Sequence, residues 1–141
     1  MSIYADTSLF VSLYVPDRHT TECEKRLASK PVLWITPLHV AEWTHAIELH
    51  VFRRSASRRE ADRSHWLFRK HCQQGYWRLT SLPEGAFELC AQLAEKHAAQ
   101  MGMRTLDSLH VACALELKAE RFWTFDQRQA ELAVAAGLKV K

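Results

Sequence analysis

The sequence predicts an α/β fold in which an open parallel β-sheet carries helices on both faces. Short apolar segments of strand type alternate with longer segments of helical periodicity along all 141 residues. Such alternation is typical of β-α-β units, because parallel strands need a crossover connection between them. A hydrophobic fraction of 48% with only four glycines and four prolines argues against disorder. We therefore expect a single domain over residues 1–141.

In the N-terminal half, turn and cap residues separate the expected elements. These are a strand at 2–5, helices at 7–15 and 17–29, a strand at 32–36, and helices from 37 and over 53–74. Pro16 ends the first helix, and Thr36-Pro37 starts the third, since a hydroxyl caps free N–H groups and proline fits the first helical turn. That helix should bury a stripe at helical spacing, formed by Val40, Trp43, Ile47 and Val51.

The C-terminal half continues the alternation of strand and helix. The expected elements are a strand at 76–80, helices at 84–101 and 105–118, a strand at 121–125, a helix at 126–136 and a last strand at 138–140. The helix over 105–118 is apolar nearly all round and should be buried. Gly137 is the expected C-cap of the last helix. The helix over 84–101 should bury one face, which holds Phe87, Cys90, Ala94 and Ala98.

Composition narrows the class of protein. The net charge of +3 permits an anionic partner such as RNA without requiring one. No apolar run reaches the ~18 residues that a membrane span needs, and the opening MSIYADTS has no signal-peptide pattern. We therefore expect a soluble, cytoplasmic protein. The four cysteines lack a C-x-x-C pair, which argues against structural zinc, and Cys90 and Cys113 are expected to be buried thiols.

Four acidic residues stand out by their positions. Asp6 and Asp126 each end an apolar strand segment, whereas Glu42 and Asp107 lie in apolar helical segments, where an unpaired carboxylate is costly. The carboxyl ends of parallel strands meet at one edge of a sheet, so these groups could converge there. Converging carboxylates repel one another unless a cation lies among them. Because oxygen donors without thiolates suit Mg²⁺ or Mn²⁺, the pattern favours a divalent-metal site and metal-assisted phosphodiester hydrolysis.

Each of the three aspartates also has a simpler interpretation. Asp6 could cap the helix that follows it, and Asp126 could form a capping box with Gln129. Asp107 lies in the first turn of a helix, where negative charge complements the helix dipole. Glu42 is too deep in its helix to act as a cap, although an exposed position on the outer face is an alternative. The hypothesis of a metal site therefore rests on the four acids taken together.

The histidines and hydroxyls near the acids leave alternatives open. His45 and His110 each follow an acid by three residues, a spacing found in di-iron carboxylate bundles, so a di-metal oxidase is a remote alternative. Strand-end acids do not supply the four facing helices of such a bundle, and we interpret both histidines as groups at the edge of the core or beside a ligand. Thr7 and Ser8 either bind a metal-bound water, orient a carboxylate, or make ordinary helix-start hydrogen bonds.

Residues 53–70 are strongly basic. A solvated helix face is the default for such a run, but its one-sided charge makes it the best candidate for phosphate contacts. The candidate RNA contacts are Arg53, Arg54, Arg58, Arg59 and Arg63. The helices at 17–30 and 37–74 also hold more apolar side chains than one small domain obviously buries, which predicts a protein interface. These side chains include Trp43, Phe52, Trp66 and Phe68.

Three segments resemble the PIN-domain ribonucleases, especially the VapC-type toxins of toxin–antitoxin pairs. They are YADTSLFVSLY, TPLHVAEWTHAI and RTLDSLHVACALELKAERFWTFDQRQAELAVAAGLKV. The last is the most specific, because it joins two acids, a buried helix and a strand at fixed spacing. The resemblance covers essentially the whole chain, and residues 53–80 match least.

The resemblance implies a five-stranded parallel sheet in the order 3-2-1-4-5. It assigns Asp6, Glu42, Asp107 and Asp126 to the family's acidic cluster, and Thr7 and Ser8 to its hydroxyl positions. We expect Asp6 and Asp107 to hold a Mg²⁺ or Mn²⁺ ion, and Glu42 and Asp126 to complete the catalytic site, directly or through water, or to hold a second ion. The implied activity is that of a metal-dependent endoribonuclease. The implied partners are an RNA substrate, a second copy of the chain and a cognate antitoxin. A PIN-like module that binds or processes RNA without a toxin role is the alternative.

Overall fold

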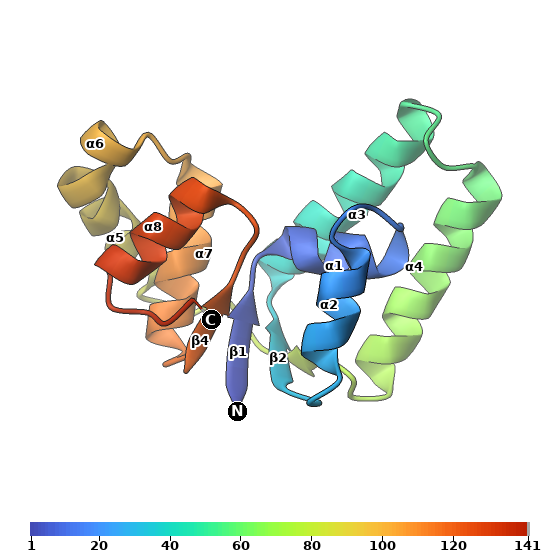
Figure 1. The fold of residues 1–141 in the computed structure, drawn as a ribbon, viewed down its shortest axis with the longest axis horizontal. Helices are drawn as coiled ribbons and strands as arrows, with labels where there is room; N and C mark the ends of the chain where they lie inside the picture. Colours follow the sequence, from blue (N-terminus) through green and yellow to red (C-terminus); the bar gives the residue numbers. More distant parts are fainter. Residues whose placement is uncertain (141) are drawn as a thin grey trace. The chain divides into compact units, whose positions relative to one another are not determined.

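The computed structural model describes residues 1–140. The chain divides into two compact units. The terminal unit comprises Met1–Asp6 and the chain from Ser81 onward, and the central unit comprises Thr7–Thr80. Figure 1 labels most of the helices and strands of both units and colours them along the chain. In the described part of the chain, no helix combines the length and the apolar character that crossing a membrane requires.

The terminal unit is built on two parallel strands and a buried helix. Strand β1 (Ser2–Ala5) pairs with β4 (Arg121–Trp123), with Tyr4 opposite Phe122. Helix α7 (Thr105–Glu116) packs against α5 (Ala86–Leu93) and α8 (Gln127–Ala135) (Figure 1). A π-helical turn, η1 (Ala94–Ala98), and the short α6 (Ala99–Met101) continue α5. As predicted, α7 is buried on nearly every side, with seven of its twelve residues inside.

The central unit holds four helices and two strands. Helix α1 (Thr7–Tyr14) packs on α2 (Thr20–Leu27) and on α3 (Pro37–Phe52). Helices α3 and α4 (Arg58–Gln73) lie side by side as a hairpin (Figure 1). Strand β2 (Val32–Ile35) pairs in parallel with the two-residue β3 (Arg78–Leu79). Stacked Trp43 and Phe68 rings, with centroids 4.2 Å apart, join α3 to α4.

The predicted α/β fold class with a parallel sheet is confirmed. The strand order is β3-β2-β1-β4, and the pairs β1–β4 and β2–β3 are parallel. The fifth strand expected at 138–140 forms only an isolated parallel bridge between Arg121 and Lys139. This bridge lies beside β4, the position that the order 3-2-1-4-5 assigns to the fifth strand. Too little of the segment after Gly137 pairs to count as a strand.

Local capping explains where the long helices of the central unit begin. The Thr36 side chain accepts a hydrogen bond from the His39 backbone N–H, and Pro37 occupies the first helical position, as predicted. The prediction that the next helix starts at residue 53 is wrong. Helix α4 starts at Arg58 because Ser57 and Glu60 form a capping box, and the backbone turns at Arg54, where φ is 59°.

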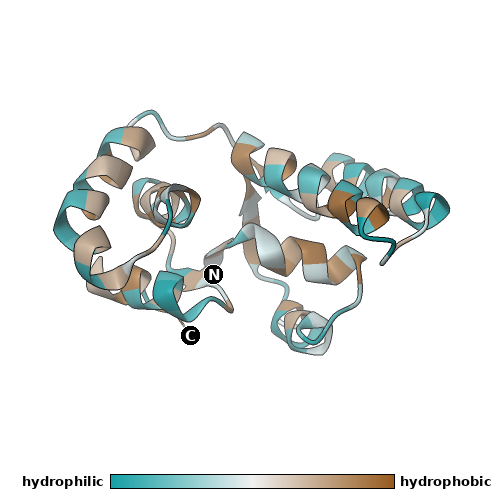
Figure 2. Ribbon diagram, turned by 90° about the horizontal axis from the view of Figure 1, so that it is seen from above, coloured by the Kyte–Doolittle hydropathy of each residue, from teal (hydrophilic) through white to brown (hydrophobic). Residues whose placement is uncertain are grey.

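Two predictions of burial fail on particular helix faces. Phe87 is 63% exposed, because the buried side of α5 is formed by Ala86, Cys90 and Leu93 instead. Val40 is 40% exposed at the start of α3, although Trp43 and Ile47 of the same stripe are buried. Figure 2 shows hydrophobic and hydrophilic residues alternating along the helix ribbons, as amphipathic helices require. Cys90 and Cys113 are buried thiols, as expected.

The predicted excess of exposed apolar side chains is half correct. Trp43 and Phe68 are buried by their mutual stacking, so they form core and not interface. Phe52 at the end of α3 is 83% exposed, and Trp66 on α4 is 56% exposed with Lys70 over its ring.

Candidate functional site

Two of the four predicted acids, Asp107 and Asp126, line one cavity of the terminal unit, of about 880 Å³. Asp107 lies in the first turn of α7, and Asp126 is the N-cap residue of α8. They are 19 positions apart in the sequence, and the α7–α8 packing brings their helix starts to the same cavity. The structure therefore places these two sequence-predicted carboxylates together.

The backbone holds one oxygen of each carboxylate. Oδ2 of Asp107 accepts a hydrogen bond from the Arg104 N–H at 3.3 Å, and Oδ1 of Asp126 accepts one from the Gln129 N–H at 2.8 Å. Both aspartates are thus helix caps, as the simpler interpretation proposed. Within residues 1–140, the second oxygen of each carboxylate has no hydrogen-bond partner. Capping therefore orients the carboxylates and leaves an oxygen of each for a further ligand.

Gln129 ties together the elements that carry the two acids. Its side chain is fully buried and accepts a hydrogen bond from the Thr124 hydroxyl at 2.6 Å. Its amide nitrogen donates to the Asp107 carbonyl oxygen at 3.3 Å. The end of β4, the start of α8 and the start of α7 are therefore joined through one side chain. The sequence around Gln129 predicts only a capping-box contact with Asp126, and no local pattern indicates this longer-range contact.

Asp6 lies at the end of β1, beside a buried histidine. Its backbone N–H donates to the Trp123 carbonyl of β4 at 2.9 Å. Nε2 of His110, on α7, lies 3.7 Å from Oδ1 of Asp6, and His110 is 1% exposed. The Tyr4 hydroxyl lies 2.8 Å from Nδ1 of His110. Because His110 follows Asp107 by about one helical turn, the same helix carries one acid and approaches another.

The second acid-x-x-His histidine behaves differently. His45 lies exposed on α3, where its Nδ1 contacts the carbonyl oxygen of Ala41 at 3.2 Å. His110 is buried beside Asp6, whereas His45 lies outside the core. The two acid-x-x-His repeats therefore have different environments, unlike the equivalent repeats of a di-iron bundle.

Glu42 and the hydroxyl residues belong to the central unit. The Thr7 hydroxyl donates a hydrogen bond to Oε1 of the half-buried Glu42 at 2.9 Å. Thr7 is 5% exposed, and Ser8 is exposed. The carboxylate that the Thr7 hydroxyl contacts here is that of Glu42, and the roles considered for Thr7 and Ser8 at a metal site stay predictions. The inclusion of Glu42 in one site with the three aspartates stays a prediction.

The donor chemistry of these acids fits a hard divalent cation. Among residues 1–140, no group of three or more His, Cys, Asp or Glu side chains is arranged to hold a metal ion on its own. Asp107 and Asp126 nevertheless present carboxylate oxygens to one cavity. Magnesium in particular is bound by one or two carboxylates and keeps several waters. Asp107 and Asp126, with Asp6 positioned by the helix that carries Asp107, match that kind of site.

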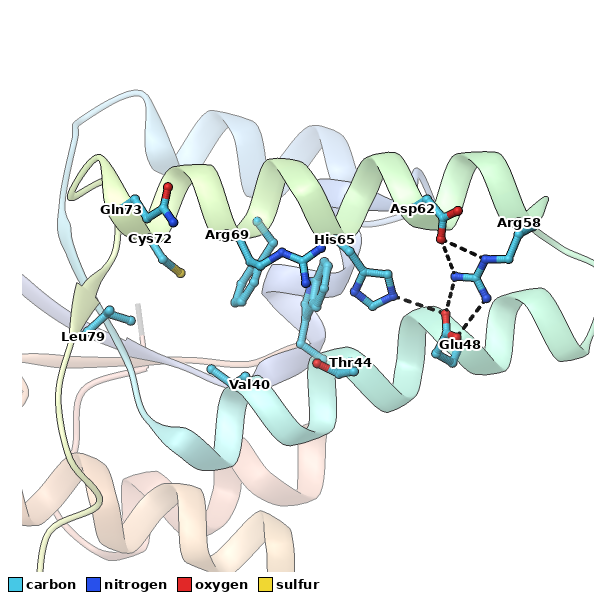
Figure 3. A pocket seen from close by; sticks show the side chains of 12 residues that line it. Val40, Thr44, Glu48, Arg58, Asp62, His65, Arg69, Cys72, Gln73 and Leu79 are labelled. Atoms are coloured by element: carbon cyan, nitrogen blue, oxygen red, sulfur yellow. Dashed lines mark hydrogen bonds and ion pairs between the residues drawn. The ribbon is translucent and has the colours of Figure 1, made fainter.

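The basic segment is less uniform than the sequence predicts. Figure 3 shows a cavity of about 670 Å³ lined by α3 and α4, in which Arg58 donates two hydrogen bonds to Glu48, at 2.9 and 2.8 Å. Arg58 also pairs with Asp62 at 2.9 Å, and His65 contacts Glu48 at 3.2 Å (Figure 3). Hydrogen bonds from Arg58 and His65 lower the pKa of Glu48 to about 2.

Arg58 is therefore an internal ion-pair partner, and its assignment as an RNA contact stays a prediction. The guanidinium is engaged on both sides by carboxylates, which also raise its pKa. The remaining candidates, Arg53, Arg54, Arg59 and Arg63, are exposed. They stay candidates for phosphate contacts.

A family model described as the PIN domain matches residues 3–135. The chain belongs to the PIN-domain family. The match extends over both units and includes all four predicted acids, Asp6, Glu42, Asp107 and Asp126. PIN domains generally use divalent metal ions, in agreement with the carboxylate chemistry of this PIN domain.

Solved structures with the same fold include three of low sequence identity. VapC20 of Mycobacterium tuberculosis, described as a toxin that cleaves the sarcin-ricin loop, is 19% identical, with a TM-score of 0.69 over 97% of this chain and 96% of that one. FitAcB of Neisseria gonorrhoeae is 17% identical, with a TM-score of 0.69 over 98% and 95%. VapBC2 of Rickettsia felis, bound to a DNA fragment from its promoter, is 15% identical, with a TM-score of 0.68 over 100% and 98%.

At these identities the likeness establishes a shared fold. A comparison of this sequence with curated proteins found no match.

Proposed function

We propose that this PIN domain is a Mg²⁺- or Mn²⁺-dependent endoribonuclease that hydrolyses RNA phosphodiester bonds. The observation that carries the proposal is the shared cavity of Asp107 and Asp126, in a family whose members generally use divalent metal ions. Each of these carboxylates keeps one oxygen clear of hydrogen bonds within residues 1–140. His110, on the helix that carries Asp107, lies 3.7 Å from a carboxylate oxygen of Asp6.

We assign each of the four acids a role within this site. Asp6 and Asp107 would hold the main ion, and Glu42 and Asp126 would complete the site directly or through water. A bound divalent ion supplies charge stabilisation to the phosphate and lowers the pKa of a bound water. The chain's own groups keep the donors in place: the Arg104 N–H orients Asp107, the Gln129 N–H orients Asp126, and the Thr7 hydroxyl orients Glu42.

Attack by water would leave a 5′-phosphate and a 3′-hydroxyl. Such hydrolysis does not use the RNA 2′-hydroxyl as a nucleophile, so the carboxylates alone do not select RNA over DNA. The choice of RNA as substrate is supported by the likeness in fold to VapC20, whose description names it a toxin that cleaves the sarcin-ricin loop.

The proposed biological role is that of the toxin of a toxin–antitoxin pair. The fold shared with VapC20 and VapBC2 supports this role. A homodimer and a cognate antitoxin are the proposed protein partners, and the exposed Phe52 and Trp66 supply apolar surface for such contacts. A cytoplasmic location, expected from the sequence, stays a prediction.

The decisive experiment compares two acid-to-amide variants on a fluorophore–quencher RNA. Asp107→Asn should abolish cleavage, whereas Glu95→Gln, which neutralises an exposed acid on η1, should cleave like wild type. Wild-type cleavage should require Mg²⁺ or Mn²⁺ and stop with a chelator. RNA binding by wild type without cleavage in any of these ions would favour the binding-module alternative. Bound iron with near-UV absorbance would favour the oxidase alternative.

A further inference from the structure

Two arginines, Arg104 and Arg128, line the same cavity as Asp107 and Asp126. Arg104 is the N-cap residue of α7, and Arg128 is the second residue of α8. The guanidinium of Arg128 reaches to the loop before α7: a Cβ built on Gly102 would lie 3.9 Å from Nη1 of Arg128. Both cationic groups therefore border the cavity that receives the two carboxylates.

Neither guanidinium group forms a strong hydrogen bond or ion pair within residues 1–140. Nε of Arg104 lies 3.7 Å from Oδ2 of Asp107, and the Arg104 side chain is 88% exposed. An ion pair that is so open to solvent contributes little to stability. Arg128 is exposed and has no hydrogen bond or ion pair with any residue in the described range 1–140. Arg58 differs from both, because its guanidinium group donates three hydrogen bonds to the carboxylates of Glu48 and Asp62.

The charge of the cavity favours an anion only when a cation is present. Its charged lining residues are Arg104, Arg128, Asp107, Asp126 and Glu131, which gives two positive and three negative charges, a formal sum of −1. A divalent cation on the aspartates would change that sum to +1. An arginine fork matches the geometry of a phosphate group and binds it through parallel hydrogen bonds.

We propose that Arg104 and Arg128 form a phosphate-binding subsite for the RNA backbone, beside the position of the phosphodiester to be cleaved. The subsite rests on the proposed nuclease function and deepens it. It accepts a backbone phosphate of single-stranded RNA once Asp107 and Asp126 hold a divalent cation. A cavity of about 880 Å³ is large enough for a nucleotide segment.

The test measures binding of a short fluorescent RNA by anisotropy, with Mn²⁺ or with a chelator, and checks the RNA for cleavage on a gel. Arg104→Gln and Arg128→Gln should each weaken binding about tenfold in Mn²⁺, and each should lower the slope of log affinity against log salt by about one. Lys96→Gln is the matched control. It removes the same charge from an exposed residue of η1 outside the cavity and should change affinity less than about twofold.

Two further measurements separate a local contact from loss of fold or of charge. Arg128→Lys should recover part of the affinity, since it restores the charge but not the fork. Inorganic phosphate should compete with RNA for wild type in Mn²⁺ and should compete less well for Arg128→Gln. All variants should share the wild-type thermal midpoint, because neither arginine side chain contributes to the core.

The outcomes distinguish the subsite from the nuclease proposal. If wild type cleaves RNA and both arginine variants bind and cleave like Lys96→Gln, the subsite is wrong and the nuclease function stands. If wild type binds RNA through these arginines in Mn²⁺ but never cleaves it, the subsite stands and the nuclease function is wrong. Binding that is equal with Mn²⁺ and with chelator would overturn the cation-dependent subsite.

Discussion

The Thr7 hydroxyl donates a hydrogen bond to Oε1 of Glu42 over 2.9 Å, from α1 to α3 of the central unit. Thr7 is almost fully buried and Glu42 is half-buried, so water does not freely replace this contact. A hydrogen bond to an ionised acceptor is stronger than a neutral one. The carboxylate of Glu42 is therefore held in one orientation by a residue that directly follows Asp6 in the chain.

Glu42→Gln should impair RNA cleavage, most clearly at limiting Mg²⁺, because it removes the charge and keeps the shape. Thr7→Val should cause a smaller loss of the same kind, because it keeps the volume and removes only the orienting hydroxyl. Cleavage rates against Mg²⁺ concentration measure both effects. If Glu42→Gln cleaves like wild type at limiting Mg²⁺, Glu42 has only a structural role.

Asp6→Asn and Asp107→Asn should each abolish cleavage and leave the fold intact. In the Asp107→Asn variant the side-chain amide oxygen would still accept the Arg104 N–H, so the cap of α7 is preserved. Removing one carboxylate relieves repulsion, and the thermal midpoint without metal should hold or rise. Circular dichroism melts with and without Mg²⁺, together with RNase assays, test this prediction. Full activity in both variants would contradict the assignment of the site.

Tyr4→Phe should destabilise the protein by about 1–2 kcal/mol, because Nδ1 of the buried His110 loses its hydrogen-bond partner. It should also weaken Mn²⁺ binding, since His110 contacts Asp6 through its other nitrogen. Urea denaturation and titration of Mn²⁺ by calorimetry measure the two effects. Tyr76→Phe, at an exposed tyrosine of the central unit, is the control and should change neither. Lower stability with unchanged Mn²⁺ affinity would limit His110 to a packing role.

Reversing Arg59 and Arg63 to Glu should weaken RNA binding and reduce its salt dependence, without altering the choice of sequence. Arg58→Glu should instead lower the thermal midpoint, because it places a third carboxylate beside Glu48 and Asp62. Anisotropy titrations over a range of salt concentrations and thermal melts separate the two behaviours. An unchanged salt slope in the Arg59 and Arg63 double variant would show that this face of α4 does not contact RNA.

The protein should be a dimer in solution, and Phe52→Asp should shift it toward monomer, because Phe52 is the most exposed large apolar side chain described. Sedimentation velocity at several micromolar concentrations measures the association. Phe87→Asp, on α5 of the terminal unit, tests whether any exposed aromatic residue has the same effect. A monomer at every concentration, together with harmless expression of the wild-type chain, would contradict both the dimer and the toxin role.

Features that depend on local interactions are readable in the amino-acid sequence alone. The Thr36-Pro37 helix start, the burial of α7 and the capping positions of Asp107 and Asp126 follow from residues within one or two helical turns. Hydrophobic periodicity and helix capping act over that range, so both can be recognised in the sequence before the tertiary structure is known. Phe87 shows what hydrophobic periodicity does not predict. The spacing of apolar residues does not tell which of two adjacent stripes on a helix packs against the neighbouring element.

Which polar groups meet depends instead on how distant elements pack. The Tyr4–His110 contact joins residues 106 positions apart, and Arg58 is engaged by Glu48 across the α3–α4 hairpin. Arg104 and Arg128 come to one cavity because α7 packs on α8. Hydrogen bonds and ion pairs have a range of a few ångströms, and the sequence contains no local signal for which distant helix faces come that close. For that reason the capping positions of Asp107 and Asp126 could be predicted, whereas the partners of His110 and Arg58 and the shared cavity of Arg104 and Arg128 could not.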